Sequence, residues 1–279
     1  VVCIVRENNK KELLVNDEAY KKFSDHIGRY PTVMIAPDDI ELMIGPSEAR
    51  RKYLDTLLSQ IDAPYLQHLI AYNKVLQQRN SVFKAADHAP IDTTLLEVLN
   101  SQLVSNGQYI FEKRTEFLKD FFPLVANVYK RIAATDDHIN LVYESPLQTM
   151  PFDVLLAQNF QKDCILQRTT KGIHRDDLVF TMDQTAFKNE ASQGQRKSLL
   201  FALKLAEWEV LKSKNGFTPI LLLDDVFEKL DESRMYELLQ WVCTASDGQV
   251  FISDTHPQRL EQQLHAINTP FQMIELLPL

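Results

Sequence analysis

In the last third of the chain, runs with the hydrophobic pattern of a helix take turns with runs that have the pattern of a buried strand. Some runs repeat apolar residues at helical spacing, and shorter runs between them are rich in aliphatic residues, as in buried strands. The helix-type runs are Ser198–Lys212, Ser233–Thr244 and Pro257–Ala266, and the strand-type runs are Pro219–Leu223, Gln249–Ser253 and Phe271–Leu276. Such alternation is typical of a mostly parallel sheet with covering helices, so this part is predicted to be α/β.

The middle of the chain has the pattern of long helices. A helix start is predicted at Asp62-Ala63-Pro64, because proline is tolerated in a first turn. A seven-residue repeat then follows at Leu69, Leu76 and Phe83. Further on, helical spacing is kept by Ile110, Phe117, Phe121, Val125, Val128 and Ile132, with Pro123 as a predicted break or kink. The sequence therefore predicts a short helical arm that packs back on itself.

The start of the chain is rich in short strand patterns. Val1–Val5 and Leu13–Val15 are separated by a charged turn and predict a hairpin, and Thr32–Ile35 predicts another strand. Two later strands, Ile139–Tyr143 and Leu178–Phe180, bracket the return from the helical region. The predicted organisation is a β-rich part at residues 1–45, a helical lobe at residues 46–161 and an α/β part at residues 162–279.

Composition and charge narrow the class of protein. The chain has 279 residues, of which 45% are hydrophobic, so a substantial core is expected. A net charge of -8 excludes a uniformly basic nucleic-acid binder, and any DNA contact must come from local patches. The candidate patches are Arg50-Arg51-Lys52 and Arg196-Lys197 with Lys204. The alternative is that each cluster is only a solvated face.

Cysteine spacing and segment lengths exclude other classes. Cys3, Cys164 and Cys243 lie far apart, which indicates neither a zinc site nor a disulfide framework and favours reduced thiols in the cytosol. No apolar run is long enough to cross a bilayer, and we expect no membrane association. Because the chain begins with Val1–Val5, a strand pattern without an initial Met, we expect it to be a fragment.

Two adjacent carboxylates, Asp224 and Asp225, follow the aliphatic run of residues 220–223. Four consecutive aliphatics predict a strand buried on both faces, and open α/β sheets bind ligands at the carboxyl ends of such strands. Asp224 is suited to hold a Mg²⁺-bound water, and Asp225 is suited to orient or deprotonate an attacking water. The alternative is an acidic pair that caps the strand and faces solvent.

A second polar cluster, Ser192-Gln193-Gly194-Gln195, stands at the start of a predicted helix. A serine in this position is usually an N-cap and nothing more. However, a serine hydroxyl and a glycine N–H at the positive end of a helix also recognise phosphate. The helix that begins at this cluster is followed by the acidic end of a strand and then by Leu230-Asp231 before the next helix. Because chance rarely assembles such a set in this order, the phosphate-binding interpretation is favoured.

In these residues the chain resembles the RecF family of bacterial DNA replication and repair proteins, whose ATP-binding-cassette type head is shared with Rad50 and SMC proteins. Ser192-Gln193-Gly194-Gln195 resembles the signature motif, residues 220–225 the Walker B strand and Leu230-Asp231 the D-loop. Other landmarks occur in family order: Pro37-Asp38-Asp39, Gly45-Pro46-Ser47, Arg50-Arg51, Tyr53-Leu54-Asp55, Gln78-Arg79-Asn80 and His174-Arg175-Asp176-Asp177. The resemblance covers nearly the whole chain.

The resemblance implies a RecF/Rad50-like head with a parallel sheet, an adjoining β-rich part and an inserted helical lobe. It implies ATP and Mg²⁺ as cofactors, with Asp224 and Asp225 acting within one protomer. The signature residues would complete the phosphate site of a second protomer, so that ATP drives homodimerisation, and Asp231 of the D-loop is a further nucleotide-binding candidate. The switch position falls within Ser253-Asp254-Thr255-His256, and the choice between Thr255 and His256 stays open.

Departures from the family pattern qualify this expectation. Arg196 and Lys197 stand where the family carries Gln and then Arg, and Ile173 stands where Pro is expected. None of the seven glycines begins a Gly-x-x-x-x-Gly-Lys-Ser/Thr loop, which the family carries near its N-terminus. Because that loop cradles the β- and γ-phosphates, we expect this chain alone to bind ATP weakly and not to hydrolyse it.

The resemblance also implies a function. Family members bind DNA at gaps and single-strand/double-strand junctions with RecR- and RecO-type partners, in DNA repair, replication, recombination and the SOS response. The implied location is the bacterial cytoplasm at the nucleoid. The alternatives are a non-catalytic binding or structural fragment, and an SMC/Rad50-like head that tethers DNA. The short helical lobe disfavours the last of these, since such heads carry long coiled-coil arms.

Overall fold

The computed structural model describes residues 1–7, 11–85, 90–133, 135, 137–225, 227, 232–244 and 248–275. The chain forms two compact units, each built from three separate stretches of sequence. The first unit comprises Val1–Pro31, Arg50–Phe117 and Tyr143–Asp177, and the second comprises Thr32–Ala49, Leu118–Val142 and Leu178–Leu279. The predicted division at residues 45 and 161 follows chain order and stays a prediction, because these units follow spatial proximity.

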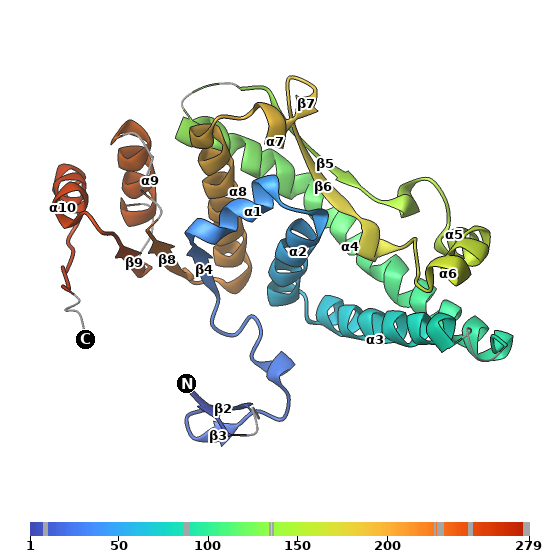
Figure 1. Cartoon of the computed structure of the whole chain (residues 1–279). Helices are drawn as coiled ribbons and strands as arrows, with labels where there is room; N and C mark the ends of the chain where they lie inside the picture. The colour runs from blue at the N-terminus through green and yellow to red at the C-terminus, as the bar shows by residue number, and fades with distance from the viewer. Residues whose placement is uncertain are drawn as a thin grey trace. The chain divides into compact units, whose positions relative to one another are not determined.

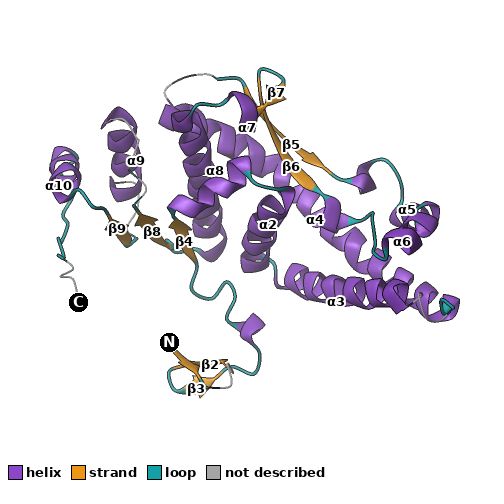
Figure 2. Ribbon diagram, in the orientation of Figure 1, coloured by secondary structure: helices purple, strands orange, loops and turns teal. Residues whose placement is uncertain are grey.

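A parallel sheet forms the centre of the second unit. Its strand order is β4 (Thr32–Ile35), β8 (Ile220–Asp224) and β9 (Val250–Ser253), and both pairings are parallel, as the alternation of helices and strands predicts (Figure 2). One face is covered: Val33, Ile35, Leu221 and Leu223 are buried. Every second side chain of β4 and β8 therefore packs into the core.

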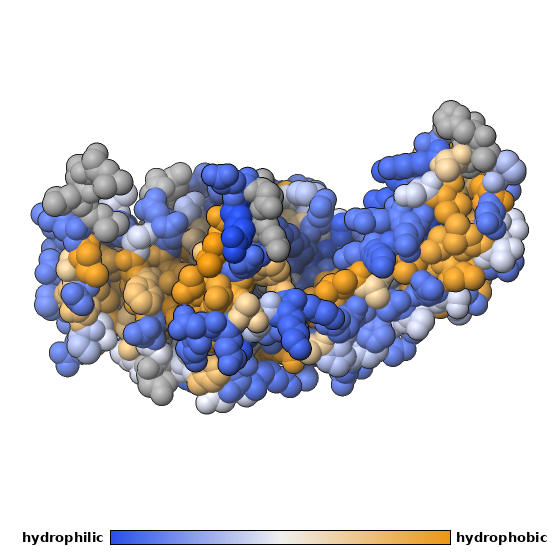
Figure 3. All heavy atoms as spheres, turned by 90° about the horizontal axis from the view of Figure 1, so that it is seen from below, coloured by the Kyte–Doolittle hydropathy of each residue, from blue (hydrophilic) through white to orange (hydrophobic). Residues whose placement is uncertain are grey.

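The opposite face of this sheet is exposed in the described residues. Met34 and Phe251 are 45% and 55% exposed, and Ile220 is 37% exposed. The prediction that the aliphatic strand is buried on both faces is therefore wrong, because only its alternate side chains pack into the core. Figure 3 shows apolar patches that interrupt the hydrophilic surface on one side of the molecule.

Three helices of the second unit, α8 (Gln193–Asn215), α9 (Glu232–Thr244) and α10 (Pro257–Ala266), form where the sequence predicts them. Two short helices, α1 (Glu41–Ile44) and α7 (Phe187–Glu190), were not predicted. The side chain of Trp208 on α8 is buried and donates from Nε1 to the Pro219 carbonyl at 3.0 Å, which fixes the helix against the start of β8. Residues 271–275 form no strand, in contrast to the prediction for Phe271–Leu276.

The first unit begins with the predicted hairpin. Strands β1 (Val2–Val5), β2 (Lys11–Val15) and β3 (Glu18–Ala19) form an antiparallel sheet. Asn16 and Asp17 both have positive φ angles, 51° and 67°, as a two-residue hairpin turn requires. A separate sheet, most of whose residues belong to the second unit, joins β5 (Ile139–Glu144), β6 (Asp177–Met182) and β7 (Thr185–Ala186), so both bracketing strands are confirmed.

The helical arm is made of α2 (Ser47–Ile61), α3 (Ala63–Ala85) and α4 (Thr93–Ala133), followed by α5 (Phe152–Gln158) and α6 (Phe160–Leu166) (Figure 1). Short 3₁₀ turns are η1 (Phe23–Asp25), η2 (Pro37–Ile40), η3 (Pro146–Gln148) and η4 (Ile173–Arg175). Helix α4 continues through Pro123, so no break occurs there. Among the described helices, none is long and apolar enough to span a membrane.

The buried seven-residue repeat of α3 differs from the predicted one. Tyr65, Tyr72 and Arg79 are each 0% exposed, and so is Phe83 of the predicted repeat, whereas Leu69 and Leu76 are only partly buried. The predicted repeat is therefore confirmed at Phe83 alone, and the other buried positions at seven-residue spacing carry polar groups that pair inside the unit. Hydrogen bonding makes this possible, since a buried polar group without a partner is strongly unfavourable.

Arg114 on α4 is the centre of one such buried network. Its guanidinium pairs with Asp176 at 2.6 Å (Nη1–Oδ2) and with Asp55 at 2.7 Å (Nη2–Oδ1), and Nε donates to the Tyr65 hydroxyl at 3.1 Å. The Tyr143 hydroxyl donates to the same Asp176 oxygen at 2.5 Å. Burial raises the pKa of Asp176, and the Arg114 charge opposes that rise. One cation therefore ties α2, α3 and β5 to the segment before β6.

Glu207 is a buried acid in the second unit. It lies on α8 with 5% exposure, and its Oε2 has no hydrogen-bond partner within the described part of the chain. Burial raises the pKa of Glu207 to about 7; the Lys204 charge opposes this and the Asp39 charge adds to it. Lys204 itself pairs with Asp39, Nζ to Oδ1, at 3.5 Å. The carboxyl group is therefore partly protonated near neutral pH.

Replacing Arg114 by Met leaves two carboxylates in the interior without their cation. We expect Arg114→Met to lower the free energy of unfolding in urea by about 3–5 kcal/mol, because breaking a buried pair leaves an uncompensated charge. The matched control is Lys113→Met, the neighbouring cation, whose side chain is 37% exposed and whose ion pairs are longer. We expect the control to lose less than about 1 kcal/mol. Equal losses in both variants would contradict this interpretation.

Replacing Glu207 by Gln should change the pH dependence of stability. The folded-state pKa of Glu207 lies above the ordinary value of about 4.3, so the folded protein retains the proton and stability falls as pH rises toward 7. Glu207→Gln removes this fall and should be more stable than the wild type at pH 8 by roughly 1–3 kcal/mol. Urea unfolding from pH 5 to 8 measures it, with Glu209→Gln on the same helix as the control. Parallel pH profiles for wild type and Glu207→Gln would exclude this role.

Candidate functional site

The carboxylate pair lies at the end of the central strand of the parallel sheet. Asp224 is the last residue of β8 and stands in register with Ser253, the last residue of β9. The Ser253 hydroxyl donates to Asp224 Oδ1 at 2.5 Å, and the Asp225 N–H donates to the Ser253 carbonyl at 3.1 Å and contacts its Oγ at 3.3 Å. Ser253 therefore holds both acidic residues.

Asp225 has a left-handed backbone conformation, with φ of 46°. Residues other than glycine occupy this region at a cost of about 1–2 kcal/mol, and aspartate is among the residues that enter it most readily. The chain thus turns sharply after Asp224, and the Ser253 contacts hold the turn. From the sequence, Ser253 belonged only to the four-residue switch segment, because only the register of β8 and β9 brings it beside the acidic pair.

The segment after β9 contains both switch candidates. The side chain of Asp254 is only 6% exposed, and its Oδ1 accepts a hydrogen bond from the His256 N–H at 2.6 Å. Thr255 Oγ1 and His256 Nδ1 lie 3.0 Å apart, and the His256 side chain is 73% exposed. Thr255 and His256 are both on the surface, so the choice between them stays open.

Ser192 is the N-cap of α8. Its Oγ accepts from the Gln195 N–H at 3.2 Å, and Gln195 Oε1 accepts from the Ser192 N–H at 2.9 Å, which makes a complete capping box. The cap interpretation is therefore correct for the chain as it stands. Gln193 is exposed and Gly194 is partly buried in the first turn, where the N–H groups of a helix start and the helix dipole favour an anion.

Gly194 allows a close approach by Arg234, from the first turn of α9. A Cβ atom added to Gly194 would lie 2.4 Å from Arg234 Nη1, so a larger residue would displace this side chain. The guanidinium thus adds positive charge at the start of α8. No sequence signal marked Arg234, which lies 40 positions further along the chain and meets the signature only in the fold.

Most of the basic candidates have acceptors inside the protein. Arg50 Nε pairs with Asp177 at 2.7 Å, Arg51 Nη1 donates to the Asp176 carbonyl at 2.7 Å, and Arg196 Nη2 donates to the Lys188 carbonyl at 2.8 Å. Lys204 pairs with Asp39, as described above. Lys52 is exposed and Lys197 is partly buried. Their predicted role in DNA binding stays a prediction.

The remaining parts of the predicted site are only partly defined. Leu230 and Asp231, the predicted D-loop, lie outside the described residues. Within the described part, no hydrogen bond or ion pair joins Ser192–Gln195 to Asp224 or Asp225. The described residues also contain no group of three or more His, Cys, Asp or Glu placed to hold a metal. The oxygen atoms of Asp224, Asp225 and Ser253 are nevertheless the kind of ligand that Mg²⁺ prefers.

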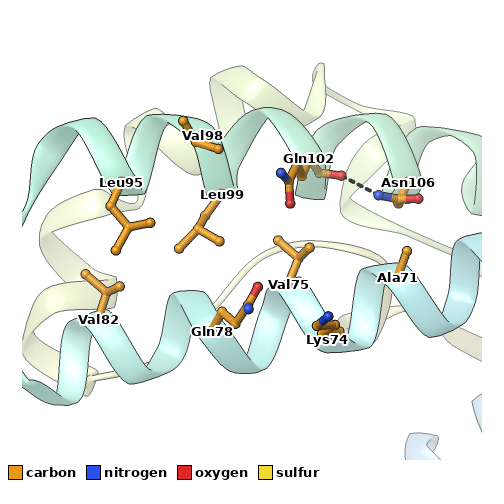
Figure 4. A pocket seen from close by; sticks show the side chains of 10 residues that line it. All are labelled: Ala71, Lys74, Val75, Gln78, Val82, Leu95, Val98, Leu99, Gln102 and Asn106. Carbon is orange, nitrogen blue, oxygen red and sulfur yellow. Dashed lines mark hydrogen bonds between the residues drawn. The ribbon is translucent and has the colours of Figure 1, made fainter.

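A separate groove of about 560 Å³ runs between α3 and α4 in the first unit (Figure 4). Apolar side chains from both helices line one end, and Lys74 with several amide side chains lines the other. Its lining is Ala71, Lys74, Val75, Gln78, Val82, Leu95, Val98, Leu99, Gln102 and Asn106. None of the predicted nucleotide-binding residues lies in it, so the groove is not the predicted phosphate site.

Comparisons with known proteins give a consistent result. No protein-family model matches the chain. The chain is 44% identical to the DNA replication and repair protein RecF of Flavobacterium johnsoniae over 278 residues, which cover 99% of this chain and 77% of that protein. It is 39% identical to the protein of the same name from Parabacteroides distasonis, with 99% and 75% covered. The sequence resemblance therefore extends over nearly the whole chain.

Solved structures agree with the sequence comparison. The fold matches the recombination mediator protein RecF-ATPrS in the RecFOR pathway with a TM-score of 0.79 and 28% identity, covering 90% of this chain and 69% of that one. The corresponding RecF-ATP structure has a TM-score of 0.78. The predicted RecF-type head with a parallel sheet and a helical lobe is confirmed. By sequence and by fold, the chain belongs to the RecF family of DNA replication and repair proteins.

Proposed function

We propose that the chain acts in ATP-dependent recombinational DNA repair and replication, where it binds DNA at gaps and junctions. The observation that carries this proposal is the 44% identity to a RecF protein over 99% of the chain. The relatives are named DNA replication and repair proteins, and the solved neighbour is a recombination mediator.

The nucleotide part of the proposal rests on two features of the second unit. Asp224 and Asp225 offer carboxylate oxygens at the end of β8, where Asp224 would hold Mg²⁺ and Asp225 would orient a water molecule. Bound ATP with Mg²⁺ would supply the reactive phosphate and the charge that the carboxylates balance. The RecF-ATP and RecF-ATPrS structures support ATP as the nucleotide.

The signature turn serves a different role from the carboxylate pair. Ser192, Gln193 and Gly194 offer a hydroxyl and N–H groups at the positive end of α8, with the Arg234 guanidinium beside Gly194. These donors suit a phosphate held by a second protomer, so ATP would join two copies. The absence of a hydrogen bond between the described residues of the two clusters is consistent with this division.

The partners follow from the proposed function. The DNA substrate would be single-stranded DNA and duplex DNA at gaps or junctions, and RecR- and RecO-type proteins would act with it, as the name of the RecFOR pathway indicates for the solved relative. A protein of this kind works in the bacterial cytoplasm, at the nucleoid. Its net charge of -8 requires that DNA contact be confined to a local surface.

DNA binding by the 279-residue chain tests this function. We expect it to bind a gapped duplex more tightly than a continuous duplex of the same length, and its affinity to fall steeply with salt because phosphate contacts release counterions. Fluorescence anisotropy between about 50 and 200 mM salt measures both effects. No binding to either DNA, or binding without a salt dependence, would overturn the proposal.

Ser253 should position the carboxylate pair through its hydroxyl group. Ser253→Ala removes the bond to Asp224 and the contact with the Asp225 N–H, so the Asp225 amide should exchange with solvent about fivefold faster, as for the loss of one hydrogen bond of about 1 kcal/mol. Ser253→Thr keeps the hydroxyl and should behave like the wild type. Amide hydrogen exchange by NMR measures it. Equal exchange in the Ala and Thr variants would rule out a role for the hydroxyl.

A further inference from the structure

An apolar tip and a basic loop stand together at the end of α6 in the first unit. Ile165 is 80% exposed and Leu166 is 44% exposed, although both are aliphatic. Several cations lie close to these two residues in the sequence. Lys162, Arg168 and Arg175 are exposed, and Lys171 is partly exposed. Residues 164–175 contain no acidic residue, on a chain whose net charge is -8. The end of α6 and the loop after it therefore place exposed aliphatic side chains beside several cations.

The carboxylates at the two ends of the loop do not neutralise it. Asp163 is 0% exposed and pairs with Arg79, Oδ2 to Nη1, at 2.8 Å. Asp176 is 1% exposed and pairs with Arg114. Because each buried acid already has a buried cation, the positive charges on the loop surface face solvent without an acidic neighbour on the same loop.

Buried hydrogen bonds fix the backbone of the loop. Asn80 Oδ1 accepts from the Thr169 N–H at 2.7 Å and from its hydroxyl at 2.8 Å. Asp163 Oδ1 accepts from the Thr170 N–H at 2.9 Å and from its hydroxyl at 2.7 Å. Arg79 Nη1 also donates to Thr169 Oγ1 at 2.7 Å. The loop is thus held from beneath by α3 and by its own first carboxylate.

His174 and Gly172 close the loop on its other side. His174 Nε2 lies 3.0 Å from the Thr169 carbonyl, and its Nδ1 lies 2.7 Å from the Tyr72 hydroxyl. Burial lowers the pKa of His174 to about 4, so the ring is neutral; Nε2–H donates and Nδ1 accepts. Gly172 has φ of 133°, and an added Cβ would lie 2.6 Å from the Tyr72 hydroxyl. The backbone of the loop is therefore preorganised, and the loop carries its cations on the surface.

We propose that residues 162–175, the basic loop, form the surface that binds DNA at a gap or junction. Lys162, Arg168, Lys171 and Arg175 contact phosphates, and Ile165 packs against a base that has lost its stacking neighbour. This inference deepens the proposed function and rests on it. Apolar wedges flanked by cations are a known means of binding unstacked DNA steps, and a preorganised loop loses little entropy on binding.

Charge complementarity favours DNA over a protein as the occupant. The loop offers four cations and no exposed carboxylate of its own, which matches a phosphate backbone. The apolar part is one protruding tip, whereas a protein partner is usually met by a wider apolar patch with aromatic anchors. Arg50, Arg51 and Lys204, by contrast, have their charges engaged inside the protein by Asp177, the Asp176 carbonyl and Asp39.

The charge of the loop is tested with the double variant Arg168→Gln/Arg175→Gln in the 279-residue chain. Each lost phosphate contact lowers the slope of log affinity against log salt by about 1, so we expect the slope to fall by about 2 and the affinity for a gapped duplex to fall roughly tenfold. The control is Lys21→Gln/Lys22→Gln, two exposed lysines of the same unit, with the same change in net charge. A slope equal to that of the control would overturn the assignment.

The wedge is tested with Ile165→Ala and a 2-aminopurine base at the edge of the gap. Wild type should raise the fluorescence of that base by unstacking it, and Ile165→Ala should lose most of the rise while keeping the salt slope. Ile70→Ala, an exposed isoleucine on α3, is the control. An unchanged fluorescence rise would contradict the role of Ile165. Thermal unfolding confirms that each variant is folded, since all altered side chains are on the surface.

DNA binding by the wild type tests the proposed function, and the loop variants test the role of residues 162–175. If the wild-type chain binds no gapped duplex, the proposed function itself is wrong. If the wild type binds but the loop variants bind with the same affinity, slope and fluorescence, only the assignment of the basic loop is wrong, and a protein partner becomes the better occupant of that surface.

Discussion

Two buried ion pairs hold the first unit together: Arg114 with Asp176, and Arg79 with Asp163. All four side chains are at most 1% exposed, so each charge depends on its partner and on the hydrogen bonds around it. The pairs connect helices α3 and α4 with the segment from residue 163 to residue 176. A hydrophobic interior could stabilise the helices equally well, but it would not fix the backbone of a polar surface loop. We infer that these pairs are kept for the geometry that they impose.

The sequence motifs acquire a physical meaning in this network. Tyr53-Leu54-Asp55, Gln78-Arg79-Asn80 and His174-Arg175-Asp176-Asp177 are far apart in the chain, yet Asp55, Arg79, Asn80, His174 and Asp176 all contribute to the buried bonds. The predicted apolar repeat of α3 was correct only at Phe83, because such a repeat cannot show which polar residues find partners inside the unit. The hairpin and the α8 cap were predictable, because short-range turn and capping rules determine them.

The candidate nucleotide site shows the same limit of sequence reasoning. Asp224 and Asp225 could be found from an aliphatic run that ends in two acids, and Ser192 from its place before a helix. Ser253 and Arg234 could not, because each reaches its target through parallel-strand register or helix packing. Pro123 shows the reverse case: a strong local breaker is overridden within a 41-residue helix. Sequence patterns therefore do not predict the site residues that reach their targets only through tertiary contacts.

The buried hydrogen bonds of the first unit fix the backbone of the basic loop, and this backbone carries the cations that are proposed to bind DNA. Hydrogen–deuterium exchange of the 279-residue chain, with and without a gapped duplex, is the most direct measurement of this relation. We expect DNA to slow exchange in peptides that cover residues 162–175, and to leave the slow exchange of the buried α3 and α4 positions unchanged. Protection confined to the start of α8 around Arg196 and Lys197, or no protection at all, would contradict it.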